Sequence, residues 1–367
     1  MQKDTRLKKI AVLFSKFEDF HWQKDPGYIS CKLNEMGYNI SVFSTLEFST
    51  PENKNIDIYT LAQEEYFTGL FLEKYHFDQL FIYHFDFRYI PLLRVAKSLG
   101  IKVIIKADHN GYLPIFESDI IRQTLYYKTK KIVKSLLNLD YKKKFSRYLD
   151  LVDFVIIESF TGYRRFVSMF PEFASKFIVI PNGYDFPGFA EYKKEKKIVA
   201  IGRWDDIKQK RVHRLLGAFI LSSEKSRHNY KLYLIGDCPD KIKNRYESKN
   251  IIFKGKQTRH EIEKELKTSK ILMMSSEWES FGNVLVEALS FNNTIVSTPH
   301  VGALDVSLDG HCGLVSEDYT VKDLANALVA EIELWENGYR NQKEIHDISS
   351  KYFDWSKVIT KIEEILS

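Results

Sequence analysis

Two glutamates, Glu279 and Glu287, lie within a strand, loop and helix pattern whose chemistry suits a phosphate ester. The apolar run 271–274 predicts a buried strand, and a helix is expected to begin near Asn283. The first amides of a helix lack intrahelical partners and carry the positive end of the helix dipole, so they attract an anion. Gly282 would let the backbone approach that anion closely. One carboxylate can then face a reacting sugar, while the other accepts hydrogen bonds from ribose hydroxyls.

Positive side chains follow a second expected strand, 198–201, directly after Gly202. Arg203 offers a planar fork of donors, and Lys208 and Lys210 offer point charges, a combination that suits a diphosphate. Such cations would also stabilise the negative charge that develops on a departing nucleotide. Their spacing leaves open which of the two lysines contacts the phosphate.

Three further segments place polar or flexible residues beside expected strands and helices. An Asn-Gly turn signal stands at 182–183, and we assign it hinge geometry. His109 follows an expected strand and should project from its carboxyl end. Gly27 lies in a short segment that precedes a helix expected at 29–36.

Parallel strands must position these candidates, and the sequence supplies two sets of them. The expected strands of the first set are 9–15, 40–43, 79–84, 102–106, 153–157 and 177–180, and those of the second are 198–201, 231–235, 251–253, 271–274 and 294–297. Nearly continuous apolar strands that alternate with helical patterns predict parallel sheets covered on both faces. Such sheets bind ligands beyond the carboxyl ends of their strands, where the strand order reverses. We therefore predict an α/β fold with two doubly wound domains.

The chain of 367 residues is long for one hydrophobic core, which also favours two domains. Proline and glycine residues between 181 and 188 mark the junction, so we expect domains at 1–186 and 187–350. The remaining segment, 351–367, carries apolar residues at helical spacing and should pack on a core surface.

The two glutamates, with seven residues between them, resemble the E-x7-E motif of the family 4 glycosyltransferases of GT-B fold, which are glycosyl transferases group 1. Gly202-Arg203 and the lysines after it are similar to that family's G-R-x(n)-K-G segment, and 180–185 is similar to its I-P-N-G-x-D segment. The alignment places Lys210 on the family lysine and Arg211 where glycine is usual. The resemblance implies two Rossmann-like domains that face each other across an interdomain cleft, with a C-terminal helix that returns to the first domain.

The resemblance also implies a retaining transfer of a sugar from a UDP-sugar or GDP-sugar to a glycan or lipid-linked acceptor, in surface polysaccharide or glycolipid synthesis. In this picture Glu279 orients the sugar, Glu287 binds ribose, and Arg203 with Lys210 stabilises the leaving diphosphate. His109 would contact the donor sugar, and Gly27 would lie on the acceptor side. The nucleotide-sugar site is then expected to comprise Gly202, Arg203, Lys210, Ser280, Phe281, Gly282, Asn283, Val284 and Glu287.

Composition narrows the classes of function. Formal net charge is +5, which is too small to favour nucleic acid as a partner. The three cysteines are far apart and lack CxxC spacing, which argues against a disulfide framework and a zinc site. The sequence contains no Asp-x-Asp pair, so we predict a metal-independent enzyme without a cofactor. The apolar run 10–14 is too short for a signal peptide or a membrane span, so we expect a cytoplasmic location.

Basic residues alternate with aromatic and aliphatic ones between Arg122 and Arg147. This pattern is typical of an interfacial helix on an anionic membrane, and it keeps open a peripheral position at the inner face of the cytoplasmic membrane. A pair of helices whose apolar stripe faces the sheet would give the same pattern. Two other classes of protein stay open for the whole chain: a sugar-nucleotide epimerase, and a noncatalytic protein of GT-B fold that binds glycans or nucleotides.

Overall fold

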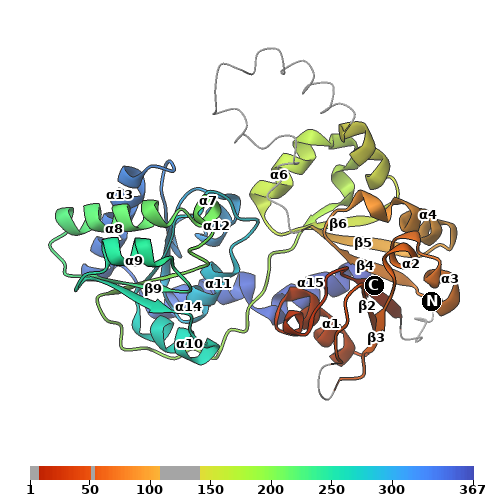
Figure 1. The fold of residues 1–367 in the computed structure, drawn as a ribbon, viewed down its shortest axis with the longest axis horizontal. Coiled ribbons are helices and arrows are strands. Elements are labelled where there is room, and N and C mark those ends of the chain that lie inside the picture. The colour runs from red at the N-terminus through yellow and green to blue at the C-terminus, as the bar shows by residue number, and fades with distance from the viewer. Residues whose placement is uncertain (1–7, 51–53, 108–140) are drawn as a thin grey trace, which may run out of the picture. The chain divides into compact units, whose positions relative to one another are not determined.

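The computed structural model describes residues 8–50, 54–107 and 141–367. The chain divides into two compact units. Unit 1 comprises the residues up to Ile180 together with Ile359–Ser367, and unit 2 comprises Pro181–Val358. Each unit is a parallel β-sheet with helices packed against it (Figure 1). The predicted architecture of two doubly wound α/β domains is thereby confirmed.

The sheet of unit 1 has the strand order β3-β2-β1-β4-β5-β6-β7, with all neighbours parallel. Its strands are β1 (Lys9–Leu13), β2 (Asn39–Ser44), β3 (Asp57–Thr60), β4 (Gln79–Tyr83), β5 (Lys102–Ala107), β6 (Phe154–Ile157) and β7 (Phe177–Val179). Its helices include α1 (Asp25–Glu35), α2 (Gln63–Thr68), α3 (Phe71–Tyr75), α4 (Ile90–Ser98), a helix at 141–149 and α6 (Phe160–Met169), with 3-10 turns η1 (Asp19–Gln23), η2 (Phe87–Tyr89) and η5 (Pro171–Lys176). The order reverses between β1 and β4, so this is the switch point of the sheet.

The sheet of unit 2 repeats this order over six parallel strands, β10-β9-β8-β11-β12-β13. They are β8 (Lys197–Ile201), β9 (Lys231–Ile235), β10 (Ile251–Gly255), β11 (Ile271–Met274), β12 (Thr294–Ser297) and β13 (Gly313–Val315). The helices are α7 (Ile207–Lys210), α8 (Val212–Lys225), α9 (Asp240–Tyr246), α10 (Arg259–Thr268), α11 (Asn283–Ser290), α12 (Val301–Val306), α13 (Val321–Glu336) and α14 (Gln342–Phe353). The switch point of this sheet lies between β8 and β11.

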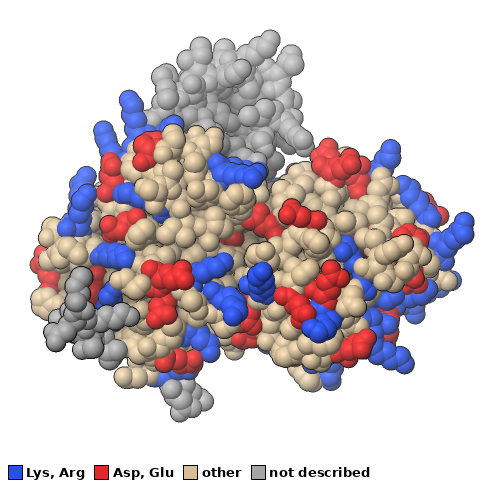
Figure 2. All heavy atoms as spheres, turned by 180° about the vertical axis from the view of Figure 1, so that it is seen from behind, with Lys and Arg blue, Asp and Glu red and all other residues tan. Residues whose placement is uncertain are grey.

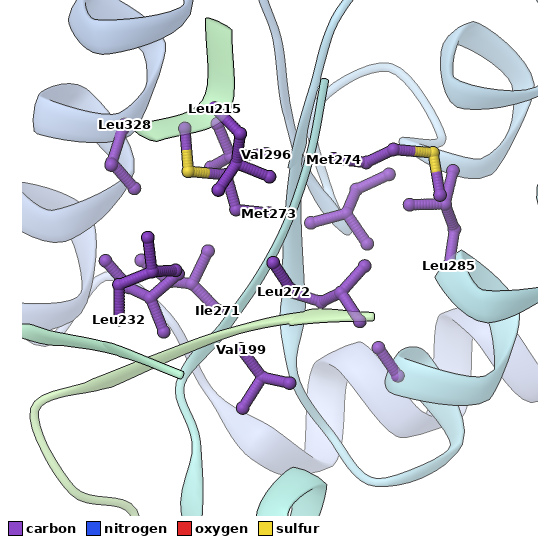
Figure 3. Close-up of a cluster of buried hydrophobic side chains, with 14 of the residues drawn as sticks. Val199, Leu215, Leu232, Ile271, Leu272, Met273, Met274, Leu285, Val296 and Leu328 are labelled. Atoms are coloured by element: carbon purple, nitrogen blue, oxygen red, sulfur yellow. The ribbon is translucent and has the colours of Figure 1, made fainter. Parts of the chain in front are cut away.

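The core of unit 2 shows why its central strand reads as a continuous apolar run. Successive side chains of a strand point to opposite faces of the sheet. Met273 of β11 packs on one face with Leu215 and Leu328, whereas Met274 points to the other face, towards Leu285 (Figure 3). Helices cover both faces, so every residue of β11 is buried.

The C-terminal helix α15 (Trp355–Leu366) follows α14 after a break at Asp354. Its last carbonyl groups accept hydrogen bonds from unit 1. Lys8 Nζ donates to Leu366 O at 2.6 Å, Gln79 Nε2 donates to the same oxygen at 2.5 Å, and Lys102 Nζ contacts Ile365 O. Lysines at the carboxyl end of a helix also stabilise its dipole. Residues Ile359–Ser367 are therefore part of unit 1.

Lys, Arg, Asp and Glu side chains are interspersed over the face of the molecule that Figure 2 presents. Within the described ranges, none of the helices combines the length and the apolar character that crossing a membrane requires.

Candidate functional site

The two predicted phosphate-binding segments of unit 2 lie at one switch point. β8 pairs with β11, and their carboxyl ends lead into the segments 202–210 and 275–282. Because ligands of open parallel sheets bind where the strand order reverses, this edge is the expected ligand site of unit 2.

Lys210 and Glu279 form an ion pair at this edge. Lys210 Nζ lies 2.5 Å from Glu279 Oε1, and Ser276 Oγ donates to the same oxygen at 2.8 Å. The side chains of Lys210 and Glu279 are only 16% and 13% exposed. Lys208, the alternative phosphate lysine, is exposed on α7. The structure thus brings Lys210 and Glu279 together, which favours Lys210 over Lys208.

Arg211 stands in the backbone conformation that explains the glycine usual at its position. Its φ is +49°, in the left-handed region, and it precedes α8. Its Nε lies 3.1 Å from Glu277 Oε2, and Arg214 Nη2 lies 2.6 Å from the same oxygen. Ser275 Oγ donates to the carbonyl oxygens of Lys210 and Arg211 at 2.7 and 3.2 Å. These contacts fix the turn that carries Lys210 to the loop that carries Glu279.

The amino terminus of α11 is shaped by close backbone packing. Gly282 precedes the helix with φ +88°, which a residue with a Cβ rarely adopts. A Cβ on Gly302 would lie 1.7 Å from Phe281 O, so the first turn of α12 packs directly on the loop. Phe281 is buried, Ser280 and Val284 are half-buried, and Asn283 is exposed. Of these four residues, Asn283 is the exposed one and stands at the helix terminus.

A buried histidine lies beneath this loop. His300 Nδ1 accepts a hydrogen bond from Ala303 N at 3.1 Å, so the proton of the neutral ring sits on Nε2, near Ser297 Oγ at 3.1 Å. Burial, together with the nearby positive charge of Lys210, lowers the pKa of His300 to about 3. His300 is therefore neutral. It supports the loop but adds no positive charge that would attract an anion away from the helix terminus.

Arg203 and Gly202 form the turn after β8. Arg203 is 77% exposed and reaches Asp206 only at 4.0 Å. A Cβ on Gly236 would lie 1.9 Å from Gly202 O, which means that the turn after β9 packs directly against this one. Arg203 is therefore an exposed cation on a fixed backbone.

Glu287 lies one helical turn inside α11, at the fifth residue of the helix. Its Oε1 accepts a hydrogen bond from Tyr184 OH at 3.0 Å. The Asn-Gly turn predicted as a hinge contacts the same helix, since Asn182 Nδ2 donates to Asn283 Oδ1 at 2.8 Å. Pattern reasoning missed both contacts, although the tyrosine beside the turn was a visible signal.

In unit 1, Gly27 lies within the first turn of α1, which begins at Asp25. The expected loop before a helix at 29–36 is therefore wrong. Pro26 lacks an amide hydrogen and has a fixed φ, which suits the first turn of a helix. A Cβ on Gly27 would lie 2.3 Å from Trp22 Cα, so Gly27 lets η1 pack on α1. His109 lies outside the described residues.

A buried charge cluster at the carboxyl edge of the unit 1 sheet was not predicted. Lys106 Nζ, at the end of β5, lies 2.5 Å from Glu158 Oε1 and 3.1 Å from Asp25 Oδ2. Lys106 and Glu158 are each 2% exposed. Lysine in a buried strand was the only available signal, and nothing in the spacing connects residues 25, 106 and 158. The cluster holds the first turn of α1 to the sheet.

Most of the predicted interfacial segment 122–147 lies outside the described residues. Of its described part, Phe145 is 1% exposed and packs in the core of unit 1, while Lys143, Lys144 and Arg147 are exposed. Lys144 Nζ lies 4.5 Å from the centroid of the Phe87 ring. At 141–147 the apolar residues thus face the core, as in a packed helix with solvated lysines.

Residues 185–345 match the model of the family described as glycosyl transferases group 1. An uncharacterised 41.2 kDa protein from the cps region of Klebsiella pneumoniae is 30% identical over 126 residues. The match spans 34% of this chain and 34% of the relative. The lipopolysaccharide outer core galactosyltransferase WaaB is similar over 98% of this chain and 99% of its own, with TM-score 0.71 and 14% identity. HepE from Anabaena, solved in complex with UDP, is similar over 98% of this chain and 99% of its own, with TM-score 0.69 and 14% identity. At this identity the two structures establish the shared GT-B fold.

Proposed function

We propose, from the match of residues 185–345 to the model of the glycosyl transferases group 1, that this protein is a retaining, metal-independent hexosyltransferase. It moves a sugar from a nucleotide-diphosphate donor, a UDP-sugar or GDP-sugar, to a glycan or lipid-linked acceptor. The observation that carries the proposal is the ion pair between Lys210 and Glu279 at the switch point of unit 2, beside the amino terminus of α11. It supports a donor site in which a cation, a helix terminus and a carboxylate meet.

The donor diphosphate binds against the first amides of α11, where the positive end of the helix dipole attracts it. Lys210 and the exposed Arg203 stabilise the negative charge that grows on the leaving diphosphate. Glu279, held by Lys210 and Ser276, orients the sugar and stabilises positive charge near its reacting carbon. Glu287 accepts hydrogen bonds from the ribose hydroxyls. UDP bound to the similar HepE structure supports a nucleotide diphosphate as ligand of this fold.

We expect purified protein to turn over one member of a panel of UDP-sugars and GDP-sugars at a rate that excess EDTA leaves unchanged. The physical reason is that fixed cations and helix amides take the role of a metal on the diphosphate. In the described part of the chain, no group of three or more His, Cys, Asp or Glu side chains is arranged to hold a metal ion. The assay measures release of free nucleotide and the anomeric configuration of the product. Loss of turnover with EDTA and rescue by Mn²⁺ or Mg²⁺ contradicts metal independence, and nucleotide binding without turnover favours a noncatalytic protein.

For the acceptor, we propose a lipid-linked or membrane-proximal glycan, with the protein bound peripherally to the inner face of the cytoplasmic membrane. The exposed Lys143, Lys144 and Arg147 support this part, because clustered cations attract anionic headgroups by about 1 kcal/mol each near the surface. Changing Lys142, Lys143 and Lys144 to Glu should abolish flotation with anionic liposomes at low salt. The matched control changes the exposed Lys193, Lys241 and Lys256 of unit 2 to Glu and should float normally. A wild-type protein that does not float with anionic liposomes indicates a soluble acceptor.

A further inference from the structure

The segment that begins unit 2 packs against the residues around Asp354, between α14 and α15. A Cβ on Gly183 would lie 2.5 Å from the indole ring of Trp355, so this glycine passes directly over that ring. Tyr184 N donates to Phe353 O at 2.9 Å, and Trp355 N donates to Tyr184 O at 3.1 Å. Both the amide and the carbonyl group of Tyr184 are therefore bonded to the residues on either side of Asp354 in the chain.

The spacing of the contact residues in this segment matches the spacing of their partners along α11. Asn182 contacts Asn283 at 2.8 Å, and Tyr184 contacts Glu287 at 3.0 Å. Alternate residues of an extended segment lie roughly 6.6 Å apart, and residues four apart on a helix are about 6 Å apart along its axis. Two residues that are two positions apart in the segment thus reach two residues that are four positions apart on α11.

The hydroxyl of Tyr184 also contacts Arg259, the first residue of α10. Arg259 Nη2 donates to Tyr184 OH at 3.1 Å, and its guanidinium carbon lies 5.4 Å from the centre of the tyrosine ring. Arginine is only a donor, so the hydroxyl oxygen accepts from Arg259 and its proton points to Glu287. Burial and the Glu287 carboxylate raise the pKa of Tyr184 above its usual range, so the hydroxyl keeps this proton.

We infer that Tyr184 is a positioning residue for the nucleotide ribose, because its hydroxyl, oriented by Arg259, fixes the carboxylate of Glu287 in the place where ribose hydroxyls bind. This inference rests on the proposed function of Glu287. A glutamate side chain on a helix surface otherwise samples several rotamers, and ordering it at the moment of binding costs conformational entropy. Tyr184 and Arg259 provide that order before the nucleotide arrives.

The experiment compares dissociation constants for UDP and 2′-deoxy-UDP by calorimetry, or for GDP and 2′-deoxy-GDP if the protein binds guanosine nucleotides. We expect the wild type to prefer the ribonucleotide by roughly tenfold or more, since a hydrogen bond to a charged group is lost in the deoxy form. Glu287→Gln should bring this preference close to one. Tyr184→Phe, which keeps the ring and removes the hydroxyl, should lower it about threefold or more. Arg259→Met should lower it by less than Tyr184→Phe.

Tyr230→Phe is the matched control. Tyr230, directly before β9, also donates its hydroxyl to a glutamate in unit 2, Glu336 Oε1 on α13, at 2.9 Å. Loss of that hydrogen bond should leave the ribose preference at the wild-type value. A loss of folding would weaken both nucleotides equally and leave the ratio unchanged, so the ratio reports positioning.

The outcomes distinguish a failure of the proposed function from a failure of the role inferred for Tyr184. A wild type that binds no nucleotide contradicts the proposed function itself. If Glu287→Gln keeps the full preference, the ribose assignment is wrong, and the role of Tyr184 is overturned with it. If Glu287→Gln loses the preference while Tyr184→Phe and Arg259→Met both keep it, Glu287 binds ribose unaided and the inference alone is wrong.

Discussion

Lys210→Ala should lower kcat by about 10²–10³, the usual effect of removing one group that stabilises charge in a transition state. Lys210 Nζ lies 2.5 Å from Glu279, and it is held in place because Ser275 Oγ bonds the Lys210 carbonyl oxygen at 2.7 Å. The ammonium group is therefore ordered before the substrate arrives. The variant should bind uridine or guanosine as well as the wild type does, because in the proposed function the interaction grows only as the diphosphate departs. Steady-state kinetics and nucleoside calorimetry measure the two quantities.

Lys208→Ala is the matched comparison for this variant, since it removes the same charge from the same short helix. Lys208 is exposed, so its loss should change kcat by less than about threefold, as expected for a solvated charge. The opposite result, with Lys208→Ala damaging and Lys210→Ala active, would show that the alignment of this turn is wrong by two residues. If Lys210→Ala and Arg203→Ala each keep the activity of the wild type, the proposed role of both cations is wrong.

Arg340→Met should destabilise unit 2 by about 3–5 kcal/mol, because it leaves a buried carboxylate without its partner. Glu331 on α13 is 0% exposed and Arg340 is 10% exposed. Arg340 Nε and Nη2 donate to the two oxygens of Glu331 at 2.8 and 2.6 Å, and Nη1 donates to Gly310 O at 2.8 Å. Burial raises the pKa of Glu331 even beside this guanidinium. Thermal denaturation should show a lower Tm, by on the order of 10 °C.

Lys343→Met provides the control for this stability loss. Lys343 Nζ lies 2.6 Å from Asp347 Oδ2, a distance like that of the buried pair, but the two side chains are 64% and 53% exposed. Exposed ion pairs contribute roughly 0–1 kcal/mol, so the Tm should change by at most a few degrees. If both variants lose the same stability, burial is not what distinguishes the two pairs.

The inner strands of both sheets could be predicted from sequence because most of their residues are apolar. β4 and β11 are buried at every position, which produces the pattern that sequence reasoning recognises. β3 and β13, which no pattern predicted, each lie at one edge of a sheet and are short. No residue of β3 is buried, so its composition does not differ from that of a loop. Pairing with β2 alone makes it a strand.

The candidate site was predictable only as far as local motifs reach. Glu279, Glu287 and Lys210 stand out by type and spacing, and the position of Glu287 one turn inside α11 follows from where the helix begins. The partners of these residues do not stand out, because Tyr184 lies 103 residues from Glu287 and Lys210 lies 69 residues from Glu279. Such contacts depend on the strand order of the sheet, which brings β8 beside β11. They become visible only with the fold.

Arg211 also has a consequence for how this sequence can change over evolutionary time. A side chain with a Cβ in the left-handed conformation costs roughly 1–2 kcal/mol relative to glycine. The half-exposed ion pair of Arg211 with Glu277 returns roughly 0–1 kcal/mol of this. An exchange of glycine for arginine at position 211 therefore costs roughly 0–2 kcal/mol while an acid stands at position 277, and roughly 1–2 kcal/mol once that acid is lost. The two positions are epistatic, so a lineage that keeps arginine here constrains a residue 66 positions away in the chain.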